Sequence, residues 1–233
     1  LTRKNTTMVL CNLASHHSAQ DYVMKQVGLH PLYELIKNDQ DSECQVFAIM
    51  TICNLGRQTN CESILEAPGG LLQLLMAMVN GKSPNLRRAS LMTLYNLSSC
   101  ESSHALYVKY GAVQEIVASI VNSDDVLCRR FALMILANLS CSDKTRVAVK
   151  KGGGLQAAVS SLKDDDLTTQ RFACVCLANM SNDTAASSQV VVHGGLQPLL
   201  RLCQMYDDAD KTQECASMCI SNLVVNEVNQ SEQ

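Results

Sequence analysis

Tryptophan is absent from this chain of 233 residues, and phenylalanine and tyrosine together make up only 4% of it. A buried core must therefore consist of Leu, Ile, Val, Ala, Met and Cys side chains, a composition that suits closely packed helices. An excess of basic residues is also lacking, since the formal net charge is −3. Because the sequence lacks the positive field that attracts nucleic acid or an anionic membrane surface, we predict neither partner.

Several motifs that would indicate a chemical site are missing as well. The longest apolar run, residues 71–79, is too short to cross a bilayer, and no signal peptide is recognisable. No CxxC pair is matched by a second Cys or His pair, and there is no calcium loop, phosphate-binding loop or spacing typical of a nucleophile with its base. We therefore predict no catalytic residue, no metal, no cofactor and no enzyme activity.

Twelve cysteines and ten methionines are present, and most of the cysteines fall within apolar helical patterns. A buried free cysteine behaves as a small apolar side chain. So many thiols fit a reducing compartment. The sequence therefore predicts reduced cysteines and a cytoplasmic or nuclear location.

The chain does contain a repeat. An asparagine followed by Leu or Met recurs six times, at intervals of 41 to 43 residues: Asn12, Asn54, Asn96, Asn138, Asn179 and Asn222. A period of this length is typical of helical solenoids. We predict a single array over residues 1–224, made of the last helix of a partial repeat (1–14) and five full repeats (15–56, 57–98, 99–140, 141–181 and 182–224), with a polar tail at 225–233. Because the chain begins within a repeat and without an initiator methionine, we expect it to be a piece of a longer protein.

Each repeat follows one pattern of three helices. An apolar cluster is followed by glycine, which ends the first helix and permits the turn into the second. The second helix leads into a loop rich in aspartate, whose side chains can cap the third helix. The third helix is the longest and ends near the asparagine, for example at 128–139, where Ala132, Leu133, Leu136 and Leu139 form part of the predicted buried face.

Three helices in about 42 residues, with glycine between the first two and Asn-Leu at the end, resemble the armadillo repeat. The resemblance covers nearly the whole chain, and a HEAT-like array of two-helix repeats is the structural alternative. It implies an all-α, right-handed superhelical solenoid whose third helices line a concave groove. The import adaptors of this family, the importin-α proteins, carry tryptophan in that groove. Since tryptophan is absent here, the chain is more similar to the β-catenin-like and Vac8-like adaptors.

Residues four apart share one face of a helix, so steps of four back from each asparagine give the side chains expected in the groove. The candidate partner-binding residues form three columns, each made of the residues at one equivalent position of successive repeats. They are the asparagines Asn54, Asn96, Asn138, Asn179 and Asn222, the methionines Met50, Met92, Met134 and Met218, and the arginines Arg88, Arg130 and Arg171. The arginine column also contains Lys4, Val46 and Glu214, and Val175 replaces methionine in one repeat.

Each column has two interpretations. A side-chain amide matches the N–H and C=O of an extended peptide, and the resemblance implies that these asparagines clamp a peptide main chain; alternatively, they hold the backbone of the next loop. Methionine either accepts varied apolar anchors or fills gaps between third helices. Arginine either binds the carboxylates of a partner or pairs with an aspartate in the loop just before its helix, such as Asp125 or Asp166.

The sequence thus predicts a protein-interaction scaffold. Its groove is expected to bind an extended or helical, acidic segment of a partner protein. The alternative function is a structural or self-assembling spacer, whose groove holds its own flanking segments or another copy of the chain.

Overall fold

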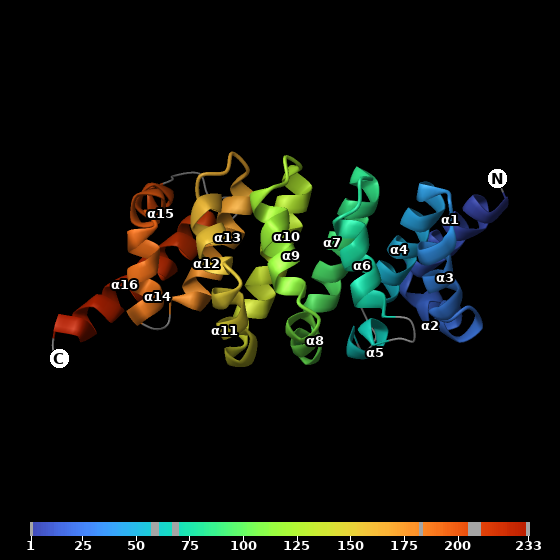
Figure 1. The fold of residues 1–233 in the computed structure, drawn as a ribbon, viewed down its shortest axis with the longest axis horizontal. Helices are drawn as coiled ribbons and strands as arrows, with labels where there is room; N and C mark the ends of the chain where they lie inside the picture. Colours follow the sequence, from blue (N-terminus) through green and yellow to red (C-terminus); the bar gives the residue numbers. More distant parts are fainter. Residues whose placement is uncertain (1, 57–60, 67–69, 182–183, 205–210, 232–233) are drawn as a thin grey trace. The chain divides into compact units, whose positions relative to one another are not determined.

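The computed structural model describes residues 2–56, 61–66, 70–181, 184–204 and 211–231. Within these residues every regular element is a helix and no strand is present, which confirms the all-α prediction. The chain forms two compact units, residues 1–112 and 113–233. Figure 1 labels the helices of each unit.

The first unit contains the predicted partial repeat, two full repeats and the first helix of the next. Its elements are α1 (Thr2–Ala14), α2 (His17–Gln26), α3 (His30–Asn38), α4 (Ser42–Leu55), α5 (Cys61–Leu65), α6 (Leu71–Val79), α7 (Pro84–Ser98), the 3-10 helix η1 (Glu101–Ser103) and α8 (His104–Lys109). The third helices are α1, α4 and α7, and α4 packs against both of the others.

The second unit begins within α9 and completes the remaining repeats. Its helices are α9 (Ala112–Val121), α10 (Val126–Cys141), α11 (Asp143–Lys151), α12 (Gly154–Ser161), α13 (Leu167–Met180), α14 (Thr184–Val192), α15 (Leu196–Cys203) and α16 (Thr212–Ser231). Here α10, α13 and α16 are the third helices, and α13 packs between α10 and α16. The predicted pattern of three helices per repeat is confirmed.

Glycine makes the turn between the first and second helices in all five full repeats. The backbone angle φ lies between 68° and 88° at Gly28, Gly70, Gly111, Gly153 and Gly194. Only glycine adopts this left-handed conformation without a steric cost from Cβ. The predicted role of glycine is therefore confirmed, and it explains why the first helix stops where it does.

Aspartate caps three of the third helices, as predicted. Asp41, Asp125 and Asp166 each accept a hydrogen bond from a backbone N–H in the first turn of α4, α10 or α13, with distances of 2.8 to 3.0 Å. Ser83 takes this position before α7. The loop before α16 carries Asp207, Asp208 and Asp210, which lie outside the described residues. These caps satisfy donors that a helix start leaves without partners, so they define where each third helix begins.

The core of each unit lies between stacked third helices and the second helices that cover them. In α10, the predicted positions Ala132, Leu133, Leu136 and Leu139 are all 0% exposed. The second helices α6, α12 and α15 pack on α7, α13 and α16 respectively. These contacts cover most of each third helix and leave one side partly exposed.

The last helix extends beyond the predicted end of the array. At 20 residues, α16 is the longest helix in the described part of the chain, and it continues to Ser231, although a polar tail was predicted from residue 225 onward. Neither α16 nor any other described helix combines the length and the apolar character needed to cross a membrane.

Candidate functional site

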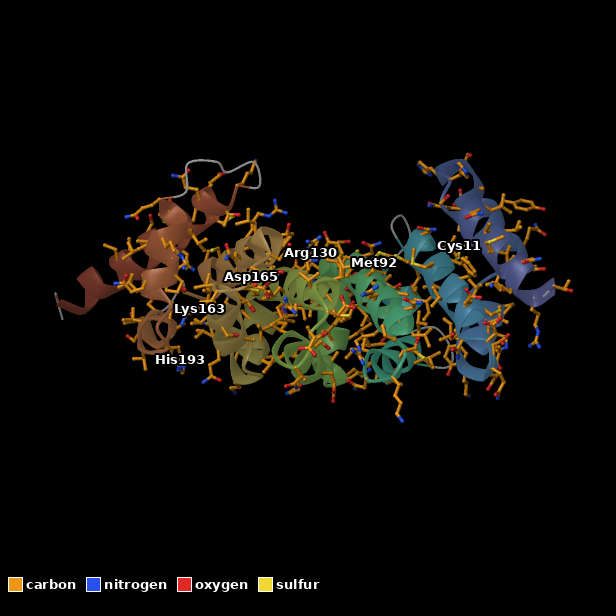
Figure 2. The ribbon with its side chains drawn as sticks, turned by 90° about the horizontal axis from the view of Figure 1, so that it is seen from above. Cys11, Met92, Arg130, Lys163, Asp165 and His193 are labelled. Carbon is orange, nitrogen blue, oxygen red and sulfur yellow. The ribbon has the colours of Figure 1, made fainter. Side chains whose placement is uncertain are left out.

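The predicted columns lie together on the partly exposed side of the third helices in each unit. This side, the third-helix face, comprises Val46, Met50 and Asn54 on α4 and Arg88, Met92 and Asn96 on α7 in the first unit; in the second it comprises Arg130, Met134 and Asn138 on α10, Arg171, Val175 and Asn179 on α13, and Met218 and Asn222 on α16. Figure 2 shows Met92 on α7, and in the second unit it shows Arg130 on the side opposite His193. Spacing in steps of four therefore places these residues on one face within each unit.

The asparagine side chains connect successive third helices. The Nδ2 atoms of Asn54, Asn179 and Asn222 donate to the carbonyl oxygens of Cys11, Ala137 and Ala178, at 3.3, 3.2 and 3.0 Å. Each acceptor lies just before the asparagine of the preceding repeat. Asn96 makes the matching contact with the Cys53 sulfur at 3.0 Å. The amide therefore satisfies a group near the end of the preceding third helix; the structural alternative predicted from the sequence was a contact with the next loop.

These contacts leave part of each amide available. A side-chain amide has two N–H donors and one oxygen acceptor. Within the described residues, Oδ1 of Asn54, Asn96, Asn179 and Asn222 accepts no hydrogen bond, and all four side chains are partly exposed. The same side chain can thus stabilise the repeat stack and still present an acceptor to a bound chain.

The methionine column forms the middle of the third-helix face. Met50, Met92 and Met134 are partly exposed, and Met218 is 56% exposed. Their position between the arginine and asparagine columns gives the face an apolar strip in each unit. A flexible thioether can adapt to different apolar groups. This geometry is compatible with both interpretations of the methionines.

Arg130 forms a bidentate ion pair, but its partner is not the aspartate before its own helix. Its Nη2 and Nε atoms donate to the Asp166 carboxylate at 2.6 and 3.2 Å. Asp166 lies in the loop before the following third helix, α13. Asp125, before α10, accepts hydrogen bonds at its Oδ1 atom from the backbone N–H groups of Leu127 and Cys128. The expected pairing with the preceding aspartate is therefore wrong for Arg130.

The environment of Asp166 favours its charged form. Burial raises the pKa of the carboxyl, but the hydrogen bonds from Arg130 and from the Thr169 hydroxyl and backbone outweigh burial, and the pKa lies below its usual value. Among the other arginines of the column, Arg171 lies 5.0 Å from the centre of the Phe172 ring, and the side chain of Arg88 is exposed.

A fourth column, which the sequence analysis missed, fixes the loop before each third helix. Nine residues before each asparagine of a full repeat is a glutamine or an arginine: Gln45, Arg87, Arg129, Gln170 and Gln213. Every one donates to a backbone carbonyl at the end of the preceding second helix or in the loop that follows it. Arg129 also forms a bidentate pair with Asp164, at 2.7 and 3.3 Å. The recurrence of long donor side chains at one position is the signal that could have revealed this column.

A cavity of about 120 Å³ lies beside Val46 in the first unit. Ser42, Glu43, Val46 and Phe47 of α4 line it together with Asn85 of α7. At its rim, Glu43 forms an ion pair with Lys4 of α1. The hydrogen bond with Glu43 raises the pKa of Lys4. No single repeat predicts this cavity, because its walls come from two helices about 42 residues apart.

Seven of the twelve cysteines are buried and have the character of core thiols. All twelve are unbridged, and burial raises the pKa of Cys174 and Cys176 far above the usual thiol value and that of Cys219 to about 12. A thiol that stays protonated is a poor nucleophile. Within the described residues, no group of three or more His, Cys, Asp or Glu side chains could hold a metal ion.

No protein-family model and no curated protein matches the chain. Among solved structures, an engineered protein is 25% identical, with a TM-score of 0.86 over 95% of this chain and 92% of that one. A computationally designed armadillo repeat protein for modular peptide recognition is 18% identical, with a TM-score of 0.84 over 94% and 92%. A second designed armadillo repeat protein, in complex with the peptide (KR)4, is 18% identical, with a TM-score of 0.83 over 94% and 92%. The chain therefore has the fold of an armadillo-repeat solenoid.

Proposed function

We propose that the third-helix face binds an extended segment of a partner protein. The observation that carries this proposal is the repeated asparagine, which is partly exposed on neighbouring third helices and whose Oδ1 atom has no partner within the described residues at four positions. An extended peptide offers an N–H donor at regular intervals along its length. A row of amide acceptors at equivalent positions is complementary to such a chain.

The spacing of the helices supports an extended ligand. Packed helices lie about 8–10 Å apart, and an extended chain rises about 3.3 Å per residue. Each repeat would therefore meet about three peptide residues. The designed armadillo proteins of similar fold, made for modular peptide recognition or bound to (KR)4, give this use of the fold a precedent.

The proposed ligand is acidic rather than basic. The column beside the methionines carries Arg88, Arg130 and Arg171, and arginine binds carboxylates through a bidentate fork. The Arg130–Asp166 pair shows that this face already holds one carboxylate in that way. A carboxylate of the partner would exchange with Asp166, as one bidentate pair replaces another. We accordingly favour a β-catenin-like adaptor role, without enzyme activity, in the cytoplasm or nucleus.

The test is selection of random peptides of about nine residues, a length that matches three repeats. We expect enrichment of peptides rich in Asp and Glu. A variant with alanine at Arg88, Arg130 and Asn138 is expected to lose this enrichment. Gln189→Ala, on the exposed side of α14, is the matched control and is expected to behave as the wild type. Equal enrichment by the triple variant and the wild type would rule out the third-helix face as the binding site.

A further inference from the structure

We propose that the cavity between the N-terminal ends of α4 and α7 receives one aliphatic side chain of the bound segment. The first unit then selects Leu, Ile or Met at a single position of an otherwise acidic ligand. This inference rests on the proposed function and adds the kind of residue that the first unit recognises.

The register of the repeats makes this site distinct. Val46 belongs to the column whose other members are charged: Lys4, Arg88, Arg130, Arg171 and Glu214. Val46 is therefore the single point at which this column becomes apolar. Phe47, the next residue, is also partly exposed and lines the same cavity. Val46 thus replaces a charge on this part of the third-helix face, and Phe47 adds a second apolar side chain beside it.

The size of the cavity fits one aliphatic side chain. Its volume is about 120 Å³. An apolar cavity of about 150 Å³ binds a benzene molecule, so a four-carbon side chain is a suitable occupant of a slightly smaller one. Burial against Val46 and Phe47 removes apolar surface of the ligand from water, which favours binding.

The charges of Glu43 and Lys4 beside the cavity disfavour both an acidic and a basic side chain of the ligand. Glu43 would repel an acidic side chain at the entrance. A lysine or arginine of the ligand would have to displace Lys4, because Lys4 already forms an ion pair with Glu43. An uncharged aliphatic side chain leaves this pair intact. Ser42 and Asn85, the remaining lining residues, are uncharged and exposed at the entrance.

One ligand segment can reach both the cavity and the asparagines. Val46, Met50 and Asn54 follow each other at intervals of four residues on α4, so each step covers about 6 Å along the helix. A main chain that lies over Met50 and Met92 is therefore about 6 Å from the asparagine column on one side and from Val46 on the other. Side chains on opposite sides of an extended segment can span these distances.

The probe is a set of labelled peptides of about nine residues with Leu, Lys, Glu or Ser at the centre and Asp, Glu, Ser and Gly elsewhere. We expect the leucine peptides to bind the wild type about tenfold more tightly than the serine peptides, as measured by fluorescence anisotropy. Val46→Arg is expected to remove this difference. The variant is expected to fold, because Arg occupies the same position in three other repeats.

Gln189→Arg is the matched control, since it adds the same charge at an exposed position of α14 outside the third-helix face. It is expected to keep the leucine preference. Equal binding of leucine and serine peptides to the wild type, or tighter binding of the lysine peptides, would overturn the aliphatic site while the proposed function stands. Failure of every peptide to bind would overturn both proposals.

Discussion

Asp166 holds two roles that a single substitution can separate. Its carboxylate caps α13 by accepting from the backbone N–H of Thr169 at 2.8 Å, and it binds Arg130 at 2.6 and 3.2 Å. Asp166→Asn keeps a good capping residue but removes the charge that holds Arg130. If Arg130 binds acidic ligands, this substitution is expected to destabilise the second unit and at the same time to strengthen acidic-peptide binding.

The expected magnitudes follow from burial. The side chains of Arg130 and Asp166 are 30% and 19% exposed, so the pair is shielded from solvent but not fully buried. Its loss is expected to cost about 1–2 kcal/mol in the free energy of unfolding. Asp166→Ala loses the cap as well and is expected to cost about 1 kcal/mol more. Since a ligand no longer has to displace Asp166, affinity for an acidic peptide is expected to rise by up to about tenfold in Asp166→Asn.

The pair also predicts an acid-sensitive stability. The pKa of Asp166 is lower in the folded protein than the usual value, so the unfolded chain binds the proton more readily. The contribution of Asp166 is therefore fully present above its unfolded pKa of about 3.9 and is lost as the pH falls through the lower folded pKa. Asp166→Asn is expected to lack this part of the acid sensitivity.

Two measurements check these expectations. Urea unfolding followed by circular dichroism gives the stability, and fluorescence anisotropy with a labelled peptide of alternating Asp and Ser gives the affinity. Asp165→Asn is the matched control, because Asp165 is an exposed neighbour and its substitution changes the net charge equally. If Asp166→Asn lowers stability but binds the peptide no better than Asp165→Asn, Arg130 is not a ligand contact.

Three further predictions concern the repeat architecture. Asn179→Ala is expected to cost about 1 kcal/mol of stability, because it removes the hydrogen bond to the carbonyl of Ala137, and an unchanged urea midpoint would contradict the inter-helix role. Gly111→Ala is expected to cost about 1–2 kcal/mol of stability through backbone strain, because φ is 70° at this residue. An added Cβ meets no atom within 4 Å, so a steric clash does not contribute to this cost. A thermal melt like that of the wild type would contradict this. Iodoacetamide is expected to label exposed Cys141 well before buried Cys176, whose pKa burial raises, and mass spectrometry showing equal rates would refute the assignment of Cys176 to the core.

Much of the fold follows from local sequence features. The glycine turn at Gly153 is recognisable because left-handed backbone favours glycine, and the aspartate cap at Asp125 because a helix start needs acceptors. The buried side of α10 follows from helical spacing, and Leu133 and Leu136 are fully buried as expected. Each of these features depends on residues only a few positions apart, which is why one repeat suffices to predict them.

The candidate site is only partly predictable in this way. Spacing places Arg130 on the third-helix face, but it does not show which carboxylate Arg130 binds. Asp125 is nearer in sequence, yet one of its oxygens caps the start of α10, whereas Asp166 comes within reach of Arg130 only when α13 packs beside α10. The asparagine contacts depend on the same packing.

The sequence by itself determined the repeat period and the helix types, because these features arise from local backbone preferences and helical spacing. Helical spacing also placed the asparagine, methionine and arginine positions on one face of each third helix, while the resemblance to the armadillo repeat implied that this face is accessible. Only the tertiary structure decided that Asn179 binds the preceding helix, that Arg130 binds Asp166 and that Val46 and Asn85 share a cavity. Asn179 and Ala137 are 42 residues apart in the sequence, and Arg130 and Asp166 are 36 residues apart. These contacts therefore depend on the distance and rotation at which neighbouring helices pack.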